Sequence, residues 1–198
     1  PPADAVAARL ARDPAILVIS RPVTYWDRLG WKDSLGREEN TRLQRQYSDT
    51  MFDGASIYTP QLVIDGSAQG IGSQETNARK QIARANAARK SSGIAVRVLR
   101  SADGSRNVML EGKAGRDAEV MLVALSARET VNIGRGENGG RSVSYTNVVI
   151  DETPVGRWTG GRQAITLTPA QIKTQGADRH VLIVRRAAGA AVIGSAWL

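Results

Sequence analysis

The stretch from Tyr58 to Gly66 constrains the fold more than any other part of this chain. Thr59-Pro60 leads through Gln61 into a short apolar run that ends at Asp65-Gly66. Proline has no N–H to give to a β-ladder, so Pro60 belongs at the first residue of a strand or on a sheet edge. Asp-Gly is a frequent two-residue hairpin turn. The stretch therefore predicts a strand, a tight turn, and a second short strand over residues 68–71.

The rest of the chain up to about residue 92 alternates helical and extended patterns. Residues 5–11 are good helix formers without a β-branched cluster. Residues 15–19 are continuously apolar, which predicts a strand covered on both faces. Two further helices are expected over residues 37–50 and 74–90, the second with Ser73 as its N-cap and Thr76 as a weaker alternative.

From residue 93 the pattern changes to short β-rich runs separated by turns. Ser91-Ser92-Gly93 marks the boundary, and Asp103-Gly104 is a clear turn. Thr168-Pro169-Ala170-Gln171 predicts a short helix with a capping box, stopped by Gly176. The pattern indicates an all-β, sandwich-like unit. Its expected strands cover residues 94–100, 107–111, 119–126, 142–150, 164–167, 180–186 and 191–198.

The cysteine and histidine content restricts the chemistry of the chain. The sequence has no cysteine and one histidine, His180. Disulfides, thiolate metal sites and cysteine catalysis are therefore excluded within these residues. A histidine metal cluster or a Ser-His-Asp triad would need unusual partners. We expect no catalytic residue, metal or cofactor in this sequence, and a structural role for His180.

The charge of the chain is clearly basic. Lys and Arg number 27 against 19 Asp and Glu, a formal net charge of +8. This balance favours an anionic partner, or it reflects the base composition of a genome. Aromatic residues for base stacking are few and no nucleic-acid motif is present, so no specific nucleic acid is expected. The longest apolar stretch, residues 187–197, is too short to span a bilayer, so only peripheral membrane contact is expected.

Several blocks of this sequence resemble a bacterial family. The first is Tyr-Trp-Asp-Arg-Leu-Gly-Trp-Lys-Asp at residues 25–33, and the second is Tyr-Thr-Pro-Gln at residues 58–61. In the second half, residues 135–141, 145–149 and 191–198 carry further similarity. These blocks resemble the secreted thioredoxin-like proteins catalogued as domain of unknown function 1223. At residues 22–24 the chain departs from the family, with Pro-Val-Thr where the family places His-Val-Asp.

The resemblance implies a thioredoxin-like α/β domain at residues 1–92 and the sandwich-like unit at residues 93–198. Such a domain has a cis-Pro, here Pro60, facing a Cys-X-X-Cys. Pro1-Pro2-Ala3-Asp4 resembles the segment that follows the cysteine pair, and the helix and strand order matches once a first strand is added ahead of Pro1. We expect a processed chain, with upstream residues supplying that strand or a partner supplying it by β-augmentation.

The function implied by the resemblance is exported, periplasmic thiol–disulfide exchange, provided that upstream residues carry the Cys-X-X-Cys. As it stands the chain has no thiol for this reaction. The alternative is a redox-inactive binding or assembly subunit of a bacterial envelope complex. In either case we expect an extended peptide or a protein as the partner.

Two sets of residues are candidate sites. The first would shape a substrate groove, although its aromatic side chains could equally anchor a loop to the core and its proline could open a strand in the trans form. It comprises Trp26, Asp27, Trp31, Tyr58, Thr59 and Pro60. The second would cradle an anion or contact the first domain, or else form an internally paired hairpin loop. It comprises Arg135, Glu137, Asn138 and Arg141.

Overall fold

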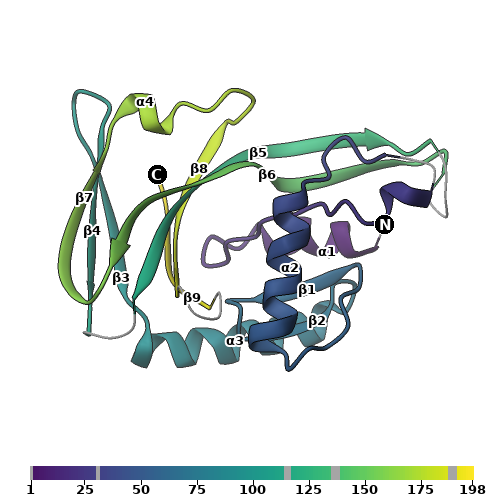
Figure 1. The fold of residues 1–198 in the computed structure, drawn as a ribbon, viewed down its shortest axis with the longest axis horizontal. Helices are drawn as coiled ribbons and strands as arrows, with labels where there is room; N and C mark the ends of the chain where they lie inside the picture. Colours follow the sequence, from purple (N-terminus) through teal and green to yellow (C-terminus); the bar gives the residue numbers. More distant parts are fainter. Residues whose placement is uncertain (1, 30–31, 114–116, 135–138, 187–190) are drawn as a thin grey trace.

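The chain is a mixed α/β protein with several antiparallel sheets (Figure 1). The computed structural model describes residues 2–29, 32–113, 117–134, 139–186 and 191–198. The helices are α1 (Pro2–Leu10), the 3-10 helix η1 (Asp27–Leu29), α2 (Glu38–Met51), α3 (Glu75–Ser92) and α4 (Pro169–Ile172). The strands are β1 (Gln61–Ile64), β2 (Ala68–Ile71), β3 (Ala95–Arg100), β4 (Arg106–Gly112), β5 (Ala118–Asn132), β6 (Ser142–Trp158), β7 (Gly161–Leu167), β8 (Arg179–Arg186) and β9 (Val192–Trp197).

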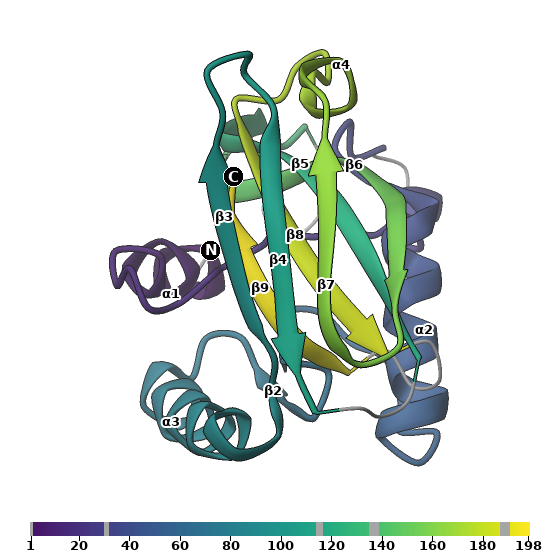
Figure 2. The same ribbon diagram turned by 90° about the vertical axis from the view of Figure 1, so that its left-hand side faces the viewer.

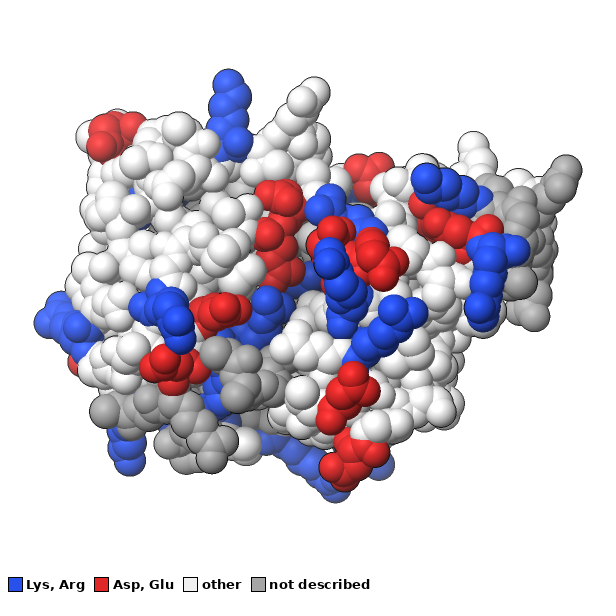
Figure 3. All heavy atoms as spheres, viewed as in Figure 1, with Lys and Arg blue, Asp and Glu red and all other residues white. Residues whose placement is uncertain are grey.

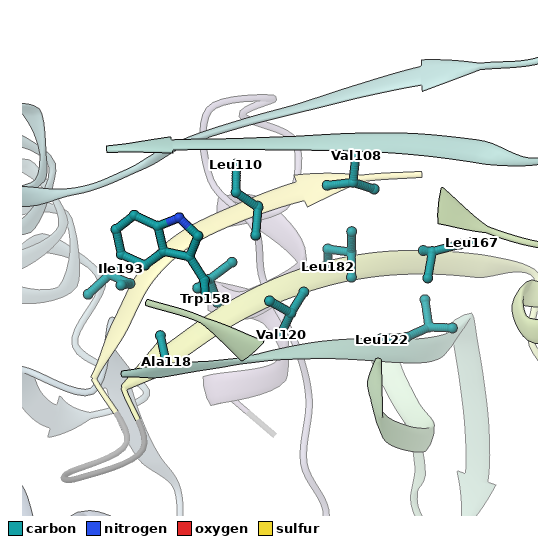
Figure 4. Packing of buried hydrophobic residues seen from close by; sticks show 10 residues of the cluster. Val108, Leu110, Ala118, Val120, Leu122, Trp158, Leu167, Leu182 and Ile193 are labelled. Carbon is teal, nitrogen blue, oxygen red and sulfur yellow. The ribbon is translucent and has the colours of Figure 1, made fainter. Parts of the chain in front are cut away.

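Two antiparallel sheets of the second half pack face to face (Figure 2). One sheet has the order β3-β4-β7 and the other has the order β6-β5-β8-β9. Leu110 and Leu167 from the first sheet meet Val120 and Leu182 from the second in a shared apolar core. Trp158 lies at one end of this core (Figure 4). The sandwich therefore closes around large apolar side chains from both sheets.

The four-stranded sheet is covered on both faces. Along β5, Val120 and Leu122 point into the sandwich, whereas Met121 and Val123 belong to a second core on the opposite face. Burial on both sides explains why the middle of β5 is continuously apolar instead of alternating. The second core is completed by Leu17 and Ile19, which come from the first half of the chain.

A third core holds the first half together. Val6 and Leu10 of α1 pack with Ala78 of α3, and Leu62 of β1 joins them. The hairpin β1–β2 turns at Asp65-Gly66, where both residues have positive φ, 47° and 64°. Two successive positive φ angles match a type I′ turn, so the hairpin predicted from this dipeptide is confirmed.

The strand predicted over residues 15–19 is absent as a regular element. Only Ser20 pairs, in an isolated parallel bridge to Val148. The side chains nevertheless alternate as in a strand: Ile16 and Val18 pack against the third core, and Leu17 and Ile19 pack against the second. The segment is thus covered on both faces as predicted. It is not a strand because, in the described ranges, no continuous ladder partner runs beside it.

The other predicted elements of the second half are found, but three strands are longer than predicted. β7 begins at Gly161, three residues before the predicted start. β5 and β6 extend well past the predicted strands, into charged and polar residues. Pro154 does not stop β6, because this strand lies at the edge of its sheet and Pro154 pairs opposite Met121 at a register shift. An edge proline costs no ladder bond when its nitrogen faces away from the neighbouring strand.

Two predictions about helix N-caps have opposite outcomes. Ser73 is not the cap of α3, which begins after Gln74 without a side-chain capping bond. For α4 the predicted capping box is confirmed: the backbone N–H of Gln171 donates to Thr168 Oγ1 at 3.3 Å, and the backbone N–H of Thr168 donates to Gln171 Oε1 at 2.9 Å. The division at residue 92 stays a prediction.

Charges of both signs are mixed on the face seen in Figure 3, particularly over α2. Arg42 lies 3.0 Å from Glu39, and Arg45 lies 3.9 Å from Glu38. This face therefore carries no continuous basic stripe of the kind that follows a nucleic-acid backbone. In the described ranges, no helix combines the length and apolarity that crossing a bilayer requires.

Candidate functional site

The peptide bond between Thr59 and Pro60 is cis, as the family resemblance implies, and not trans. The loop that holds it immediately precedes β1, and both residues are exposed. The carbonyl of Pro60 accepts a hydrogen bond from the backbone N–H of Gly72 at 2.9 Å, which extends the β1–β2 pairing by one step. Among the described residues, the backbone N–H and C=O of Thr59 itself have no hydrogen-bond partner.

The first turn of α1 lies directly beside this loop. A Cβ atom placed on Gly72 would lie 3.3 Å from the Cβ of Ala3 and 3.3 Å from the Cβ of Pro60. Ala3 and Pro60 therefore flank the same glycine, one from α1 and the other from the loop. A larger residue at Gly72 would push the two apart. The amino end of a helix thus lies beside the loop in which the exposed residue Thr59 has unpaired backbone groups.

Trp26 forms an aromatic rim on this surface. Its indole Nε1–H donates to Thr59 Oγ1 at 2.9 Å, while its side chain remains 47% exposed. The ring of Tyr25 lies against it with a centroid separation of 5.4 Å. Burial raises the pKa of the Tyr25 phenol, so this group stays neutral at physiological pH. Trp26 is therefore fixed at one edge and free to contact a ligand at its exposed face.

The remaining groove candidates have different positions. The carbonyl of Tyr58 accepts a hydrogen bond from Gln44 Nε2 at 2.9 Å, which fixes the loop to α2. Asp27 opens η1, and its Oδ1 accepts from the backbone N–H of Asp33 at 3.2 Å. The carboxylate of Asp27 thus stabilises the loop between Asp27 and Asp33. Trp31 lies outside the described residues.

Polar groups missed by the sequence interpretation gather at the first turn of α1. Burial, with smaller contributions from Asp33 and Asp4, raises the pKa of Tyr145 to about 12. Burial also raises the pKa of Asp4 and of Asp33. Since Tyr145 belongs to β6, the long β5–β6 hairpin brings a side chain of the second half to α1. The signal available in the sequence was the family-like block that begins at Tyr145.

The second candidate site falls mostly on residues that the structure does not describe. Arg135, Glu137 and Asn138 lie outside the described residues. Arg141 is exposed where the chain enters β6, and its carbonyl accepts from the backbone N–H of Ile133 at 2.9 Å. The anion-binding role of this loop stays a prediction. Within the described ranges, no group of three potential metal ligands is close enough to hold an ion.

The fold has a solved relative. The X-ray structure of protein AGR_C_4864 from Agrobacterium tumefaciens, a structural genomics target, matches this chain with a TM-score of 0.84 and 23% sequence identity. The match covers 100% of this chain and 86% of that protein. At this identity the likeness shows the fold alone. No curated protein matches the chain.

A family model matches residues 1–185, which is nearly the whole chain. The family is described as a protein of unknown function, DUF1223. The chain belongs to this family.

Proposed function

We propose that this protein is an exported, thioredoxin-like protein of the bacterial envelope that exchanges disulfides with a partner bound at the Thr59-Pro60 loop. The observation that carries the proposal concerns Thr59, an exposed residue whose backbone N–H and C=O have no partner among the described residues. It directly precedes Pro60, which lies beside the first turn of α1. The arrangement of α1, α3 and the β1–β2 hairpin around one core is consistent with a thioredoxin-like domain.

The loop is suited to an extended polypeptide. An unpaired N–H and C=O on one exposed residue can pair with the backbone of a peptide in the manner of an added strand, which is independent of the peptide sequence. The exposed face of Trp26 then supplies apolar contact to one side chain of that peptide. A partner held this way would lie across the amino end of α1.

The amino end of α1 is where a thiolate would be stabilised. Backbone N–H groups and the helix dipole lower the pKa of a cysteine at such a position. The dithiol attacks a partner disulfide, one sulfur forms a mixed disulfide, and the second sulfur releases the partner as a reduced dithiol. The 198 residues contain no cysteine, so the reaction depends on a Cys-X-X-Cys ahead of α1 in the natural protein.

A second candidate function uses the same surface without redox chemistry. The exposed Thr59 with its unpaired backbone groups and the exposed Trp26 also fit a binding or assembly subunit of an envelope complex. Such a subunit would hold an extended segment at Thr59 and Trp26 and release it unchanged. The two functions differ in whether a disulfide in the partner is reduced.

The test is an insulin-reduction assay on the full-length natural protein and its Trp26→Ala variant. We expect reduction by the natural protein, and a lower rate with Trp26→Ala because the rim of the groove is lost. Trp197→Ala is the matched control, since Trp197 is 42% exposed and lies on β9 of the sandwich. No insulin reduction by the natural protein would refute the exchange function and leave the binding function, which a peptide-binding measurement with the same variants then tests.

A further inference from the structure

Two adjoining cavities are lined by residues of α4, of β8 and of the segments beside them. Figure 1 places α4 at the far end of the sandwich from α1 and the β1–β2 hairpin. Their volumes are about 280 Å³ and about 350 Å³, at the lower end of the range for small-molecule sites. Arg106 of β4, Ile172 of α4 and His180 of β8 line both cavities. Residues of both sheets and of α4 therefore converge on one space.

Two residues on this lining each carry a buried side-chain nitrogen without a partner. Among the described residues, His180 Nε2 and Arg106 Nε have no hydrogen-bond partner. The guanidinium of Arg106 is anchored by its Nη1, which donates to the carbonyl of Gly104 at 2.6 Å. A buried polar nitrogen without a hydrogen-bond partner costs free energy. A bound group that brings an acceptor to either nitrogen would therefore stabilise the complex.

The charge of the lining favours an anion. Asp178 carries the one side-chain carboxylate among the described residues that line the cavities, and its Oδ1 already accepts from the backbone N–H of Ala127 at 2.8 Å. The cationic residues on the lining are Arg100, Arg106, Lys173 and Arg179. Arg100 Nη2 donates to Leu198 O at 3.1 Å and Arg179 Nη1 donates to Asn147 Oδ1 at 3.0 Å, so these two arginines are already partly paired. Cationic side chains outnumber the side-chain carboxylate, so an acceptor with a negative charge binds here more favourably than a neutral acceptor.

The rest of the lining is apolar. Ile172, Trp197 and Leu198 line the first cavity, and Pro169 lines the second. Trp197 is 42% exposed, so one edge of its ring is open to a ligand and to solvent. Small-molecule sites usually combine an apolar wall with a small number of polar groups that point to the same place.

We propose that these cavities form a binding site for a small carboxylate that carries an apolar group. Arg106 and His180 hold the carboxylate, and Trp197 with Ile172 covers the apolar part. An inorganic anion contacts only Arg106 and His180, because it has no apolar group to place against Trp197 and Ile172. The site is independent of the proposed disulfide exchange.

His180 makes the proposal directly testable because it is the only histidine in the sequence. Its imidazole Cε1–H signal in a ¹H NMR spectrum needs no assignment among other histidines. Benzoate is the probe, benzyl alcohol its neutral counterpart, and inorganic phosphate the anion without an apolar group. We expect benzoate to shift the His180 signal saturably, with a dissociation constant of about 1 mM or tighter, and to raise the pKa of His180. Benzyl alcohol and phosphate should bind at least about tenfold more weakly.

A variant pair confirms the location. Arg106→Gln should weaken benzoate binding at least about tenfold, whereas Arg84→Gln, which removes an exposed cation from α3, should leave it unchanged. Absence of a saturable benzoate shift would overturn the proposal, and so would phosphate binding as tight as benzoate binding. The comparison of benzoate, benzyl alcohol and phosphate uses the unaltered protein, so it can be made even when Arg106→Gln does not fold.

Discussion

At the scale of single residues, the Thr59-Pro60 loop is held by few contacts. Trp26 reaches it through one hydrogen bond to the Thr59 hydroxyl, and Gln44 holds the neighbouring Tyr58 carbonyl. The contact between Trp26 and Thr59 lies at the surface, where the net contribution of a neutral hydrogen bond to stability is small. The loop can therefore lose this contact without unfolding the protein.

The variant Thr59→Val tests this separation of stability from binding. Valine keeps the shape of threonine and removes the hydroxyl that accepts from Trp26. We expect the free energy of unfolding in urea to fall by no more than about 1 kcal/mol, because the bond is exposed. Insulin reduction by the full-length protein should fall more, because Trp26 is no longer fixed. A loss of about 3 kcal/mol would instead mean that this hydrogen bond is needed for the stability of the fold.

The raised pKa of Tyr145 predicts a specific change in alkaline stability. The unfolded phenol ionises near its ordinary pKa of about 10, while the folded phenol keeps its proton up to about pH 12. The stabilising contribution of this phenol is complete below pH 10 and is lost as the pH rises through 12. Tyr145→Phe lacks this dependence. Urea denaturation at pH 9, 10 and 11 should show the variant losing less stability than the parent, and parallel curves would contradict the assignment.

At the scale of elements, the sandwich core carries much of the stability. Leu182 of β8 is fully buried between the two sheets, whereas Leu99 of β3 is 69% exposed. Both are leucines in regular strands, so they form a matched pair. Removal of a buried leucine side chain loses transfer free energy and leaves a cavity, but removal of an exposed one does neither.

We therefore expect Leu182→Ala to lower the free energy of unfolding by about 2–5 kcal/mol. Leu99→Ala should change it by no more than about 0.5 kcal/mol. Urea denaturation monitored by far-UV circular dichroism measures both. Equal effects of the two variants would mean that the sheets do not enclose a core at Leu182.

Turn and cap chemistry made several elements predictable from sequence. Asp65-Gly66 and Thr168 with Gln171 act through neighbouring residues only, so the sequence shows them directly. Ser73 was misleading because its spacing fits a cap, yet the chain enters α3 at Gln74 without one. The lengths of β5 and β6 depend on pairing between residues far apart, which local patterns do not report.

The polar cluster at α1 was unpredictable for the same reason. Asp4, Asp33 and Tyr145 are separated by long stretches of sequence and meet only because β6 folds back over α1. The Thr59-Pro60 loop and Trp26 were predicted as neighbours from the family resemblance, and their hydrogen bond places them together. Candidate residues 31, 135, 137 and 138 lie outside the described ranges.

At the scale of the whole molecule, a network of charged side chains connects the first half to the large sheet. Glu152 of β6 forms two ion pairs: its Oε2 lies 2.6 Å from Arg21 Nη1, and its Oε1 lies 3.2 Å from Nη1 of Arg185 in β8. Arg21 follows the extended segment that carries Leu17 and Ile19 into the second core. The three charged side chains are only 14–21% exposed, so the pairs are poorly screened by solvent.

The variant Glu152→Gln should destabilise the protein by about 3 kcal/mol, because two arginines are left without their carboxylate in a largely buried place. Asp117→Asn is the control, since the pair between Asp117 and Arg157 at 2.8 Å is largely exposed and worth about 1 kcal/mol or less. Urea denaturation gives both values. A loss no larger than that of the control would show that the network does not join the two halves.

The central claim is that the surface beside α1 supports thiol–disulfide exchange in the natural protein. The most direct measurement is a thiol titration of the full-length natural protein under native conditions, before and after oxidation. We predict two reactive thiols in the reduced protein, which become one disulfide on oxidation and return with a reductant. A protein with no titratable dithiol would contradict the claim and leave the Thr59-Pro60 loop as a binding surface.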